Sequence, residues 1–172
     1  MTYFHKELAN RGLLSVKFNF DYMEAKRRMP DPQPKLQARY RSVVLEVMNE
    51  YQPKRLIIGG KSMGGRVASY IAADTPGVSA LVFLGYPLHP PGKIDQLRDQ
   101  HLYLLKIPML FISGTKDTFA ERELLERVVH KIGENATLVW IDGGDHSLKR
   151  KKNDVESLAI AVDTITTWAA RI

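Results

Sequence analysis

Short apolar runs alternate with stretches of helical spacing along the chain. The apolar runs, which we interpret as strands, cover residues 13–20, 56–58, 81–84, 109–112 and 137–141. Apolar residues recur every three or four positions, as in amphipathic helices, over residues 34–51, 67–73, 124–132 and 155–168. Uninterrupted apolar strands separated by helices are typical of a sheet that is covered on both faces. The pattern therefore predicts an α/β fold with a mostly parallel sheet and helices on both sides.

No internal repeat or linker divides this pattern. The proline-rich stretch at 29–34 is short, and we interpret it as a stiff loop that leads into a helix. We therefore expect a single domain over residues 1–172. In parallel sheets of this kind ligands bind outside the carboxyl ends of the strands, so the residues that follow each strand are where a functional site is expected.

A glycine-rich turn with a central serine follows the second predicted strand. Residues 60–64 are Gly-Lys-Ser-Met-Gly, and they lead directly into a helix. The glycines allow a sharp turn from strand to helix, and such a turn projects the hydroxyl of Ser62 above the sheet. The amide of Met63 would then point to where an oxyanion forms. The turn predicts Ser62 as a nucleophile and Met63 as an oxyanion donor.

This turn has two other interpretations. A phosphate-binding loop would need a glycine at position 55, where the chain has Arg55, and residues 55–58 resemble a strand rather than a loop. The turn could also be a tight strand-to-helix connection whose serine has no chemical role.

A serine nucleophile needs a base, and the base needs a carboxylate that orients it. Asp117 lies in the loop after the strand at 109–112, and His146 lies in the loop after the strand at 137–141. Both loops leave the sheet at the same edge as Ser62. The sequence therefore predicts that these three side chains meet there.

Each partner also has a simpler interpretation. Asp117 could cap the helix that follows it, and His146 could be an exposed loop residue. Asp142 and Asp145 share the loop of His146, and we interpret them as turn residues.

The amino-acid composition excludes several classes of chemistry and of partner. The chain has no cysteine, which excludes disulfides, thiolate metal sites and a cysteine nucleophile. No histidine and carboxylate spacing typical of a metal site occurs, so we expect no metal and no cofactor. No apolar run approaches the roughly 20 residues that cross a bilayer, and the first residues lack a signal-peptide core. We expect a soluble, cytoplasmic protein with no membrane partner.

Basic residues outnumber acidic ones by 25 to 19, which gives a formal net charge of +6. Four of them are consecutive, at residues 149–152. This cluster could be an ordinary solvated loop, could steer an anionic substrate, or could bind nucleic acid. No aromatic residues that would stack on bases are interleaved with it, so we expect no nucleic-acid partner.

Taken together, these motifs resemble the α/β-hydrolase superfamily. More narrowly, the chain is similar to a family of small bacterial hydrolase-like proteins related to dienelactone-hydrolase-type enzymes and to the testis-expressed protein 30 family. The similar segments span nearly the whole chain and comprise residues 17–24, 59–66, 86–92, 114–119 and 143–148. The order serine, acid, histidine is also that of the superfamily. The resemblance implies that Ser62 is the nucleophile, Asp117 the acid and His146 the base.

The chain departs from the resembled family at its beginning. Family members start with further strands, and a His-Gly-type loop after one of them supplies the second oxyanion amide. Here residues 1–12 already resemble the first helix, so we expect an N-terminally shortened fold. The strand that this leaves out would lie between those at 13–20 and 56–60. Either these two strands pair directly, or a partner chain fills the place, or the chain is a truncated product.

The leading functional hypothesis is an esterase-like serine hydrolase that acts on a small carboxylic ester, thioester or related acyl substrate. The segment between the strand at 81–84 and Pro108 is short, which predicts a minimal cap and an open site. We expect Lys61, Tyr86 and His89 to line the substrate pocket, although His89 could equally belong to a rigid proline-fixed loop. The alternative is a catalytically silent hydrolase-like scaffold or interaction protein. The sequence also leaves open whether the protein forms a homodimer.

Overall fold

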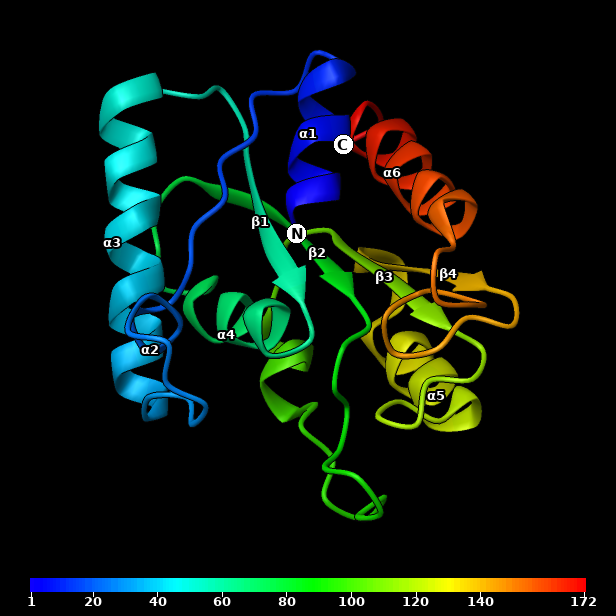
Figure 1. Cartoon of the computed structure of the whole chain (residues 1–172). Helices are drawn as coiled ribbons and strands as arrows, with labels where there is room; N and C mark the ends of the chain where they lie inside the picture. Colours follow the sequence, from blue (N-terminus) through cyan, green and yellow to red (C-terminus); the bar gives the residue numbers. More distant parts are fainter.

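A computed structural model describes residues 1–172 and contains a parallel four-stranded sheet flanked by helices (Figure 1). The strands, in their order across the sheet, are β1 (Leu56–Lys61), β2 (Val78–Leu84), β3 (Met109–Gly114) and β4 (Ala136–Ile141). The α-helices are α1 (Thr2–Asn10), α2 (Asp21–Glu24), α3 (Gln33–Tyr51), α4 (Met63–Ile71), α5 (Arg122–Ile132) and α6 (Val155–Ala169). Two short 3₁₀ helices complete the set, η1 (Gln100–Leu104) and η2 (Gly133–Asn135). The predicted parallel α/β architecture is confirmed.

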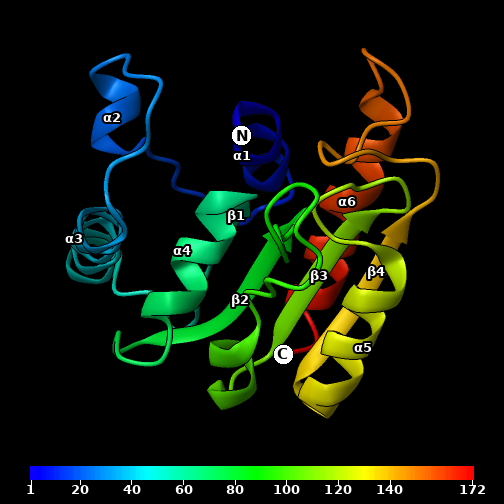
Figure 2. The same ribbon diagram turned by 90° about the horizontal axis from the view of Figure 1, so that it is seen from below.

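The strand order follows the chain, so β1 and β4 form the two edges of the sheet (Figure 2). The central strand β3 is buried along its whole length, as its uninterrupted apolar sequence predicts. Its register with β2 pairs Leu81 with Met109 and Leu84 with Ile112. All four strands run in the same direction, so their carboxyl ends meet at one edge of the sheet, where the loops after β1, β3 and β4 gather.

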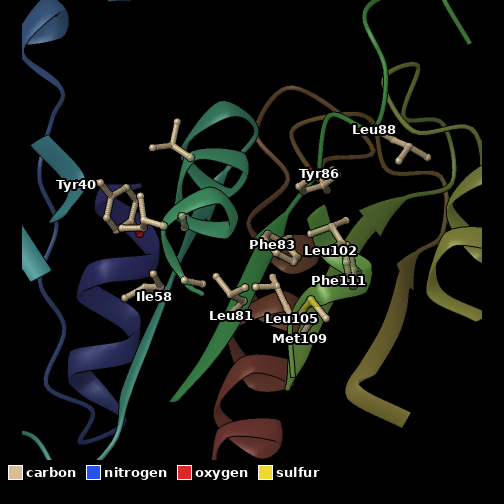
Figure 3. Close-up of a cluster of buried hydrophobic side chains, with 14 of the residues drawn as sticks. Tyr40, Ile58, Leu81, Phe83, Tyr86, Leu88, Leu102, Leu105, Met109 and Phe111 are labelled. Atoms are coloured by element: carbon tan, nitrogen blue, oxygen red, sulfur yellow. The ribbon is translucent and has the colours of Figure 1, made fainter. Parts of the chain in front are cut away.

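Helices cover both faces of the sheet. On one face α1 lies beside α6, and Phe4 and Trp168 share a core with Leu110 of β3 (Figure 1). On the other face α4 and α5 pack over Phe83 and Phe111, whose rings lie 4.6 Å apart (Figure 3), and α3 packs against α4. Successive side chains of a strand point to opposite faces, which is why β2 and β3 contribute to both cores. None of the helices combines the length and apolar character needed to cross a bilayer.

The predicted strand at 13–20 is absent. This segment is irregular, and no backbone hydrogen bond joins it to β1, so direct pairing of the two segments, one of the three alternatives, is also wrong. The aromatic residues that suggested a strand pack instead against α3, where the rings of Phe18 and Phe20 lie 5.0 and 6.3 Å from that of Tyr40. The alternation of apolar and polar residues therefore serves packing against a helix.

Candidate active site

The turn between β1 and α4 holds Ser62 in an unusual backbone conformation. Its φ is +52° and its ψ is −123°, in a region that few residues other than glycine adopt. The turn closes tightly because α4 approaches β1 at two glycines. A Cβ atom at Gly65 would lie 2.7 Å from the carbonyl oxygen of Gly60, closer than real contacts allow. The glycines thus permit the sharp turn that directs the serine hydroxyl away from the sheet.

The structure brings together the three side chains that the sequence singles out. Nε2 of His146 lies 2.8 Å from Oγ of Ser62, and Nδ1 of His146 lies 2.9 Å from Oδ2 of Asp117. A carboxylate only accepts hydrogen bonds, so Nδ1 carries the proton and Nε2 is left to accept from the serine hydroxyl. This is the arrangement in which an imidazole acts as general base toward a serine.

The carboxylate of Asp117 is held from several sides. Its side chain is buried, and it accepts hydrogen bonds from the Phe119 amide at 2.9 Å and from Oγ of Ser113 at 3.5 Å. The ring of Phe119 lies against that of His146, with 4.3 Å between centroids. The histidine is therefore fixed by a hydrogen bond at one ring nitrogen and by an aromatic neighbour on its face.

Gly85, directly after β2, makes room for the acid and the histidine. Its φ is +64°, and a Cβ atom there would lie 2.8 Å from the His146 carbonyl oxygen and 3.4 Å from Oδ2 of Asp117. Sequence reasoning missed both Gly85 and Phe119. A glycine directly after a buried strand was the available signal for the first, whereas nothing in the sequence indicates that the Phe119 ring meets the histidine.

The Met63 amide is the first N–H of α4, and it forms no hydrogen bond within the protein. A helix N-terminus also carries a partial positive charge. This donor can therefore serve a negative oxygen that develops on a group bound at Ser62.

The three residues predicted to line the substrate pocket differ in their surroundings. Lys61 is exposed, and its Nζ donates to Oγ of Ser147, in the loop of the histidine. Tyr86 and His89 are each 1% exposed. Nδ1 of His89 bonds the Pro90 carbonyl at 2.9 Å, whereas its Nε2 is buried without a partner. In this structure both side chains belong to the interior, and their part in a pocket stays a prediction.

The competing acids accept hydrogen bonds within their own surroundings. Asp145 accepts from the amides of Ser147 and Lys149, and Asp142 accepts from Oγ1 of Thr115 at 3.4 Å. Neither contacts the ring nitrogens of His146. No group of three or more histidine, aspartate or glutamate side chains is placed to hold a metal ion.

Comparison with known proteins agrees with this fold. The model of a protein family described as "alpha/beta hydrolase domain" matches residues 1–171. The chain also resembles solved structures of an esterase domain from Rhodothermus marinus and of an alpha-beta serine hydrolase homologue from Coxiella burnetii. The first has 17% identity and a TM-score of 0.73, over 99% of this chain and 79% of that one. The second has 20% identity and a TM-score of 0.74, over 95% and 73%.

A third similar structure is that of XC6422 from Xanthomonas campestris, described as an a/b serine hydrolase without lid. It shares 22% identity and a TM-score of 0.73, over 97% of this chain and 72% of that one. At these identities the likenesses show a common fold. Because the family model matches this chain over residues 1–171, the chain belongs to the alpha/beta hydrolase family.

Proposed function

We propose that this protein is an esterase-like serine hydrolase in which Ser62 attacks a small carboxylic ester, thioester or related acyl substrate. The observation that carries the proposal is the continuous hydrogen-bonded path from Asp117 through His146 to Ser62, with contacts of 2.9 and 2.8 Å. Three loops that are distant in the sequence supply these groups at one sheet edge. A serine without a chemical role would need neither the strained turn nor the bonded histidine and carboxylate.

The proposed reaction begins when Nε2 of His146 takes the hydroxyl proton of Ser62 as Oγ attacks the acyl carbon. The carbonyl oxygen becomes negative, and the Met63 amide donates to it. Collapse of this intermediate breaks the bond to the alcohol or thiol, which leaves with the proton from the histidine. Water, deprotonated by the same histidine, then attacks the acyl-serine; the bond to Oγ breaks, the acid is released, and the histidine returns the proton to Oγ of Ser62. Asp117 keeps the ring in the required tautomer throughout.

Labelling with a fluorophosphonate tests the proposal. Such reagents form a covalent bond with a serine that has an adjacent base, whereas a serine without one stays inert. We expect intact-mass measurement to show one adduct on the parent protein and none on Ser62→Ala. An adduct that persists in Ser62→Ala would remove this serine from the mechanism. A parent protein that takes up no label, and hydrolyses no ester, would favour a silent scaffold.

A further inference from the structure

The outer edge of β4 has no neighbouring strand. β4 pairs with β3 on one side and forms one margin of the sheet, with α5 and α6 on its two faces (Figure 2). The Ile141 carbonyl accepts from the Thr115 amide at 3.1 Å, so Ile141 faces β3. Alternate residues of a parallel strand face opposite neighbours, so the backbone groups of Leu138 and Trp140 point outward. These amides and carbonyls are free to pair with a further strand.

The sequence of β4 does not protect this edge. The strand reads Ala-Thr-Leu-Val-Trp-Ile, without a charge or a proline, and its register with β3 is unbroken by a bulge. Natural sheets usually protect a free edge with a lysine, a proline or a bulge. The edge strand on the other side of the sheet, β1, ends in Lys61. Within β4 only Ile141 is buried, so an apolar strand lies partly exposed at the margin of the sheet. Such an edge is a template for pairing with another chain.

An open groove runs beside the same edge, between β4 and α6. It has a volume of about 440 Å³, and its lining includes Val139 of β4 and Ile160 and Thr167 of α6. Ile160 is 42% exposed. The groove has two charged lining residues, Asp163 of α6 and Arg171, which lies two residues after this helix ends. The free strand edge and the apolar groove therefore form one continuous surface.

The two charges of the groove are complementary to each other. Arg171 takes part in no ion pair of the chain. Asp163 lies 2.7 Å from Arg11, yet 64% of its side chain remains exposed. Asp163 and Arg171 are eight positions apart, which corresponds to about 12 Å along a helix axis. When two such segments lie antiparallel, Asp163 of each can face Arg171 of the other, so a second copy of the chain matches this surface.

We propose that β4 and the adjacent groove form the contact surface of a homodimer, in which the β4 strands of two copies pair antiparallel about a twofold axis. In such a dimer the same surface serves on both copies, and each contact occurs twice. The outward backbone groups of Leu138 and Trp140 bond those of the second copy, which joins the two sheets into one. The charge pair between Asp163 and Arg171 forms across the two copies of α6. Because this surface includes no residue of the proposed reaction, the inference does not depend on the proposed function.

Sedimentation velocity of the full chain tests the oligomeric state. We expect a dimer at micromolar concentrations, because a specific interface buries on the order of 1,000 Å² or more. Arg171→Glu would place two acids opposite each other at both symmetric contacts and should weaken dimerisation by about tenfold or more. Arg28→Glu makes the same charge change in the exposed loop after α2, across the molecule from β4, and should leave the dimer unchanged (Figure 1). A monomer at every concentration would overturn the inference.

A second variant tests the strand itself. Thr137 is exposed on β4, and Thr137→Lys introduces a charge of the kind that keeps natural edge strands from pairing. We expect this variant to be monomeric at concentrations where the parent protein is a dimer. Thermal melting of each variant shows whether it is folded. A dimer that survives both Thr137→Lys and Arg171→Glu in folded proteins would place the contact elsewhere and overturn the inference.

Cross-linking tests the symmetry of the proposed dimer. The chain has no cysteine, so a single introduced cysteine reports on its own position. Thr167 is exposed and lies midway between Asp163 and Arg171, so it faces its own copy across the twofold axis. A short bismaleimide should join two copies of Thr167→Cys and should not join Asn49→Cys, an exposed position on α3. A dimer in which Thr167→Cys stays unlinked would have a different interface, and it would overturn the inference.

Discussion

At the scale of a single residue, Ser62 combines a strained backbone conformation with a hydrogen bond to His146. A non-glycine residue in its conformation costs on the order of 1–3 kcal/mol, and it persists only where the surrounding structure holds it. Here the neighbouring strand β2 holds it from one side, where the Ser62 amide donates to the Leu84 carbonyl at 3.0 Å, and the first turn of α4 holds it from the other. The strained turn is what places Oγ within reach of His146.

The substitution Asp117→Asn tests whether Asp117 orients His146 without being needed for folding. The asparagine keeps an oxygen for the Phe119 amide, so we expect the thermal midpoint to stay within a few degrees. Its amide group can donate where the carboxylate only accepts, which favours the wrong histidine tautomer. Esterase activity should therefore fall by about 10³- to 10⁴-fold, as loss of the orienting carboxylate does in serine enzymes. Rates on a 4-nitrophenyl ester and a melting curve measure both effects.

The matched control is Asp142→Asn. This carboxylate lies in the loop of His146 but accepts only from Thr115, at 3.4 Å, so its loss should leave the rate nearly unchanged. If Asp117→Asn were as active as the parent protein, the acid would be no more than a turn residue that bonds the Phe119 amide.

At the scale of elements, β1 is an edge strand whose outer side is partly closed by α3. The Tyr40 hydroxyl accepts from the Gly59 amide at 3.0 Å and donates to the Gly59 carbonyl at 2.6 Å. One phenol thus occupies the position that a neighbouring strand would take. Unpaired polar groups at an edge are costly when they are withdrawn from water, so this contact stabilises the strand that carries the serine.

Tyr40→Phe should destabilise the protein by about 1–3 kcal/mol in urea unfolding, because it keeps the ring but leaves both Gly59 groups unpaired. Tyr51→Phe, an exposed position on the same helix, is the control. Burial also raises the pKa of the Tyr40 hydroxyl to about 12. A folded-state pKa above the unfolded value of about 10 gives stability that is complete below pH 10 and lost as the pH rises toward 12.

The parent protein should accordingly lose about 1 kcal/mol more than Tyr40→Phe between pH 9 and pH 11. Parallel stability curves for the two proteins over this interval would show that the hydroxyl is not shielded from ionisation.

At the scale of the whole molecule, the net charge of +6 invites a role for the basic cluster at 149–152. The residues of this cluster differ in the contacts that they make. Arg150 belongs to the start of α6, where it bonds Oγ of Ser157 at 2.8 Å and lies 3.4 Å from the capping residue Asp154. Lys151 and Lys152 are exposed and take part in no ion pair. These two and Lys149, which also takes part in no ion pair, remain for long-range attraction.

We expect the double change Lys151→Ser and Lys152→Ser to leave kcat/KM for an anionic 4-nitrophenyl ester unchanged at physiological ionic strength. The charges of solvated lysines are screened beyond about 10 Å at 0.1 M salt. The measurement is the salt dependence of kcat/KM for this anionic ester and for a neutral ester of the same length. A shallower salt slope for the anionic ester alone would show that the cluster steers the substrate.

Much of the fold could be predicted from the sequence because β1 to β4 and the long helices carry their own periodicity. The error at 13–20 has a physical cause: Phe18 and Phe20 alternate with polar residues as in a strand, but the surface they meet belongs to α3. An apolar pattern shows that side chains need burial and does not say what will bury them.

The sequence by itself determined the parallel α/β architecture and the serine turn, because periodic burial and glycine-dependent turns are local properties of the chain. It also placed Asp117 and His146 in loops at one sheet edge. Only the tertiary structure decided that these groups lie within hydrogen-bonding distance, that Gly85 leaves space for them, and that the Tyr40 hydroxyl bonds Gly59. Such contacts join residues that are far apart in the chain, and their distances are set by how the helices pack on the sheet.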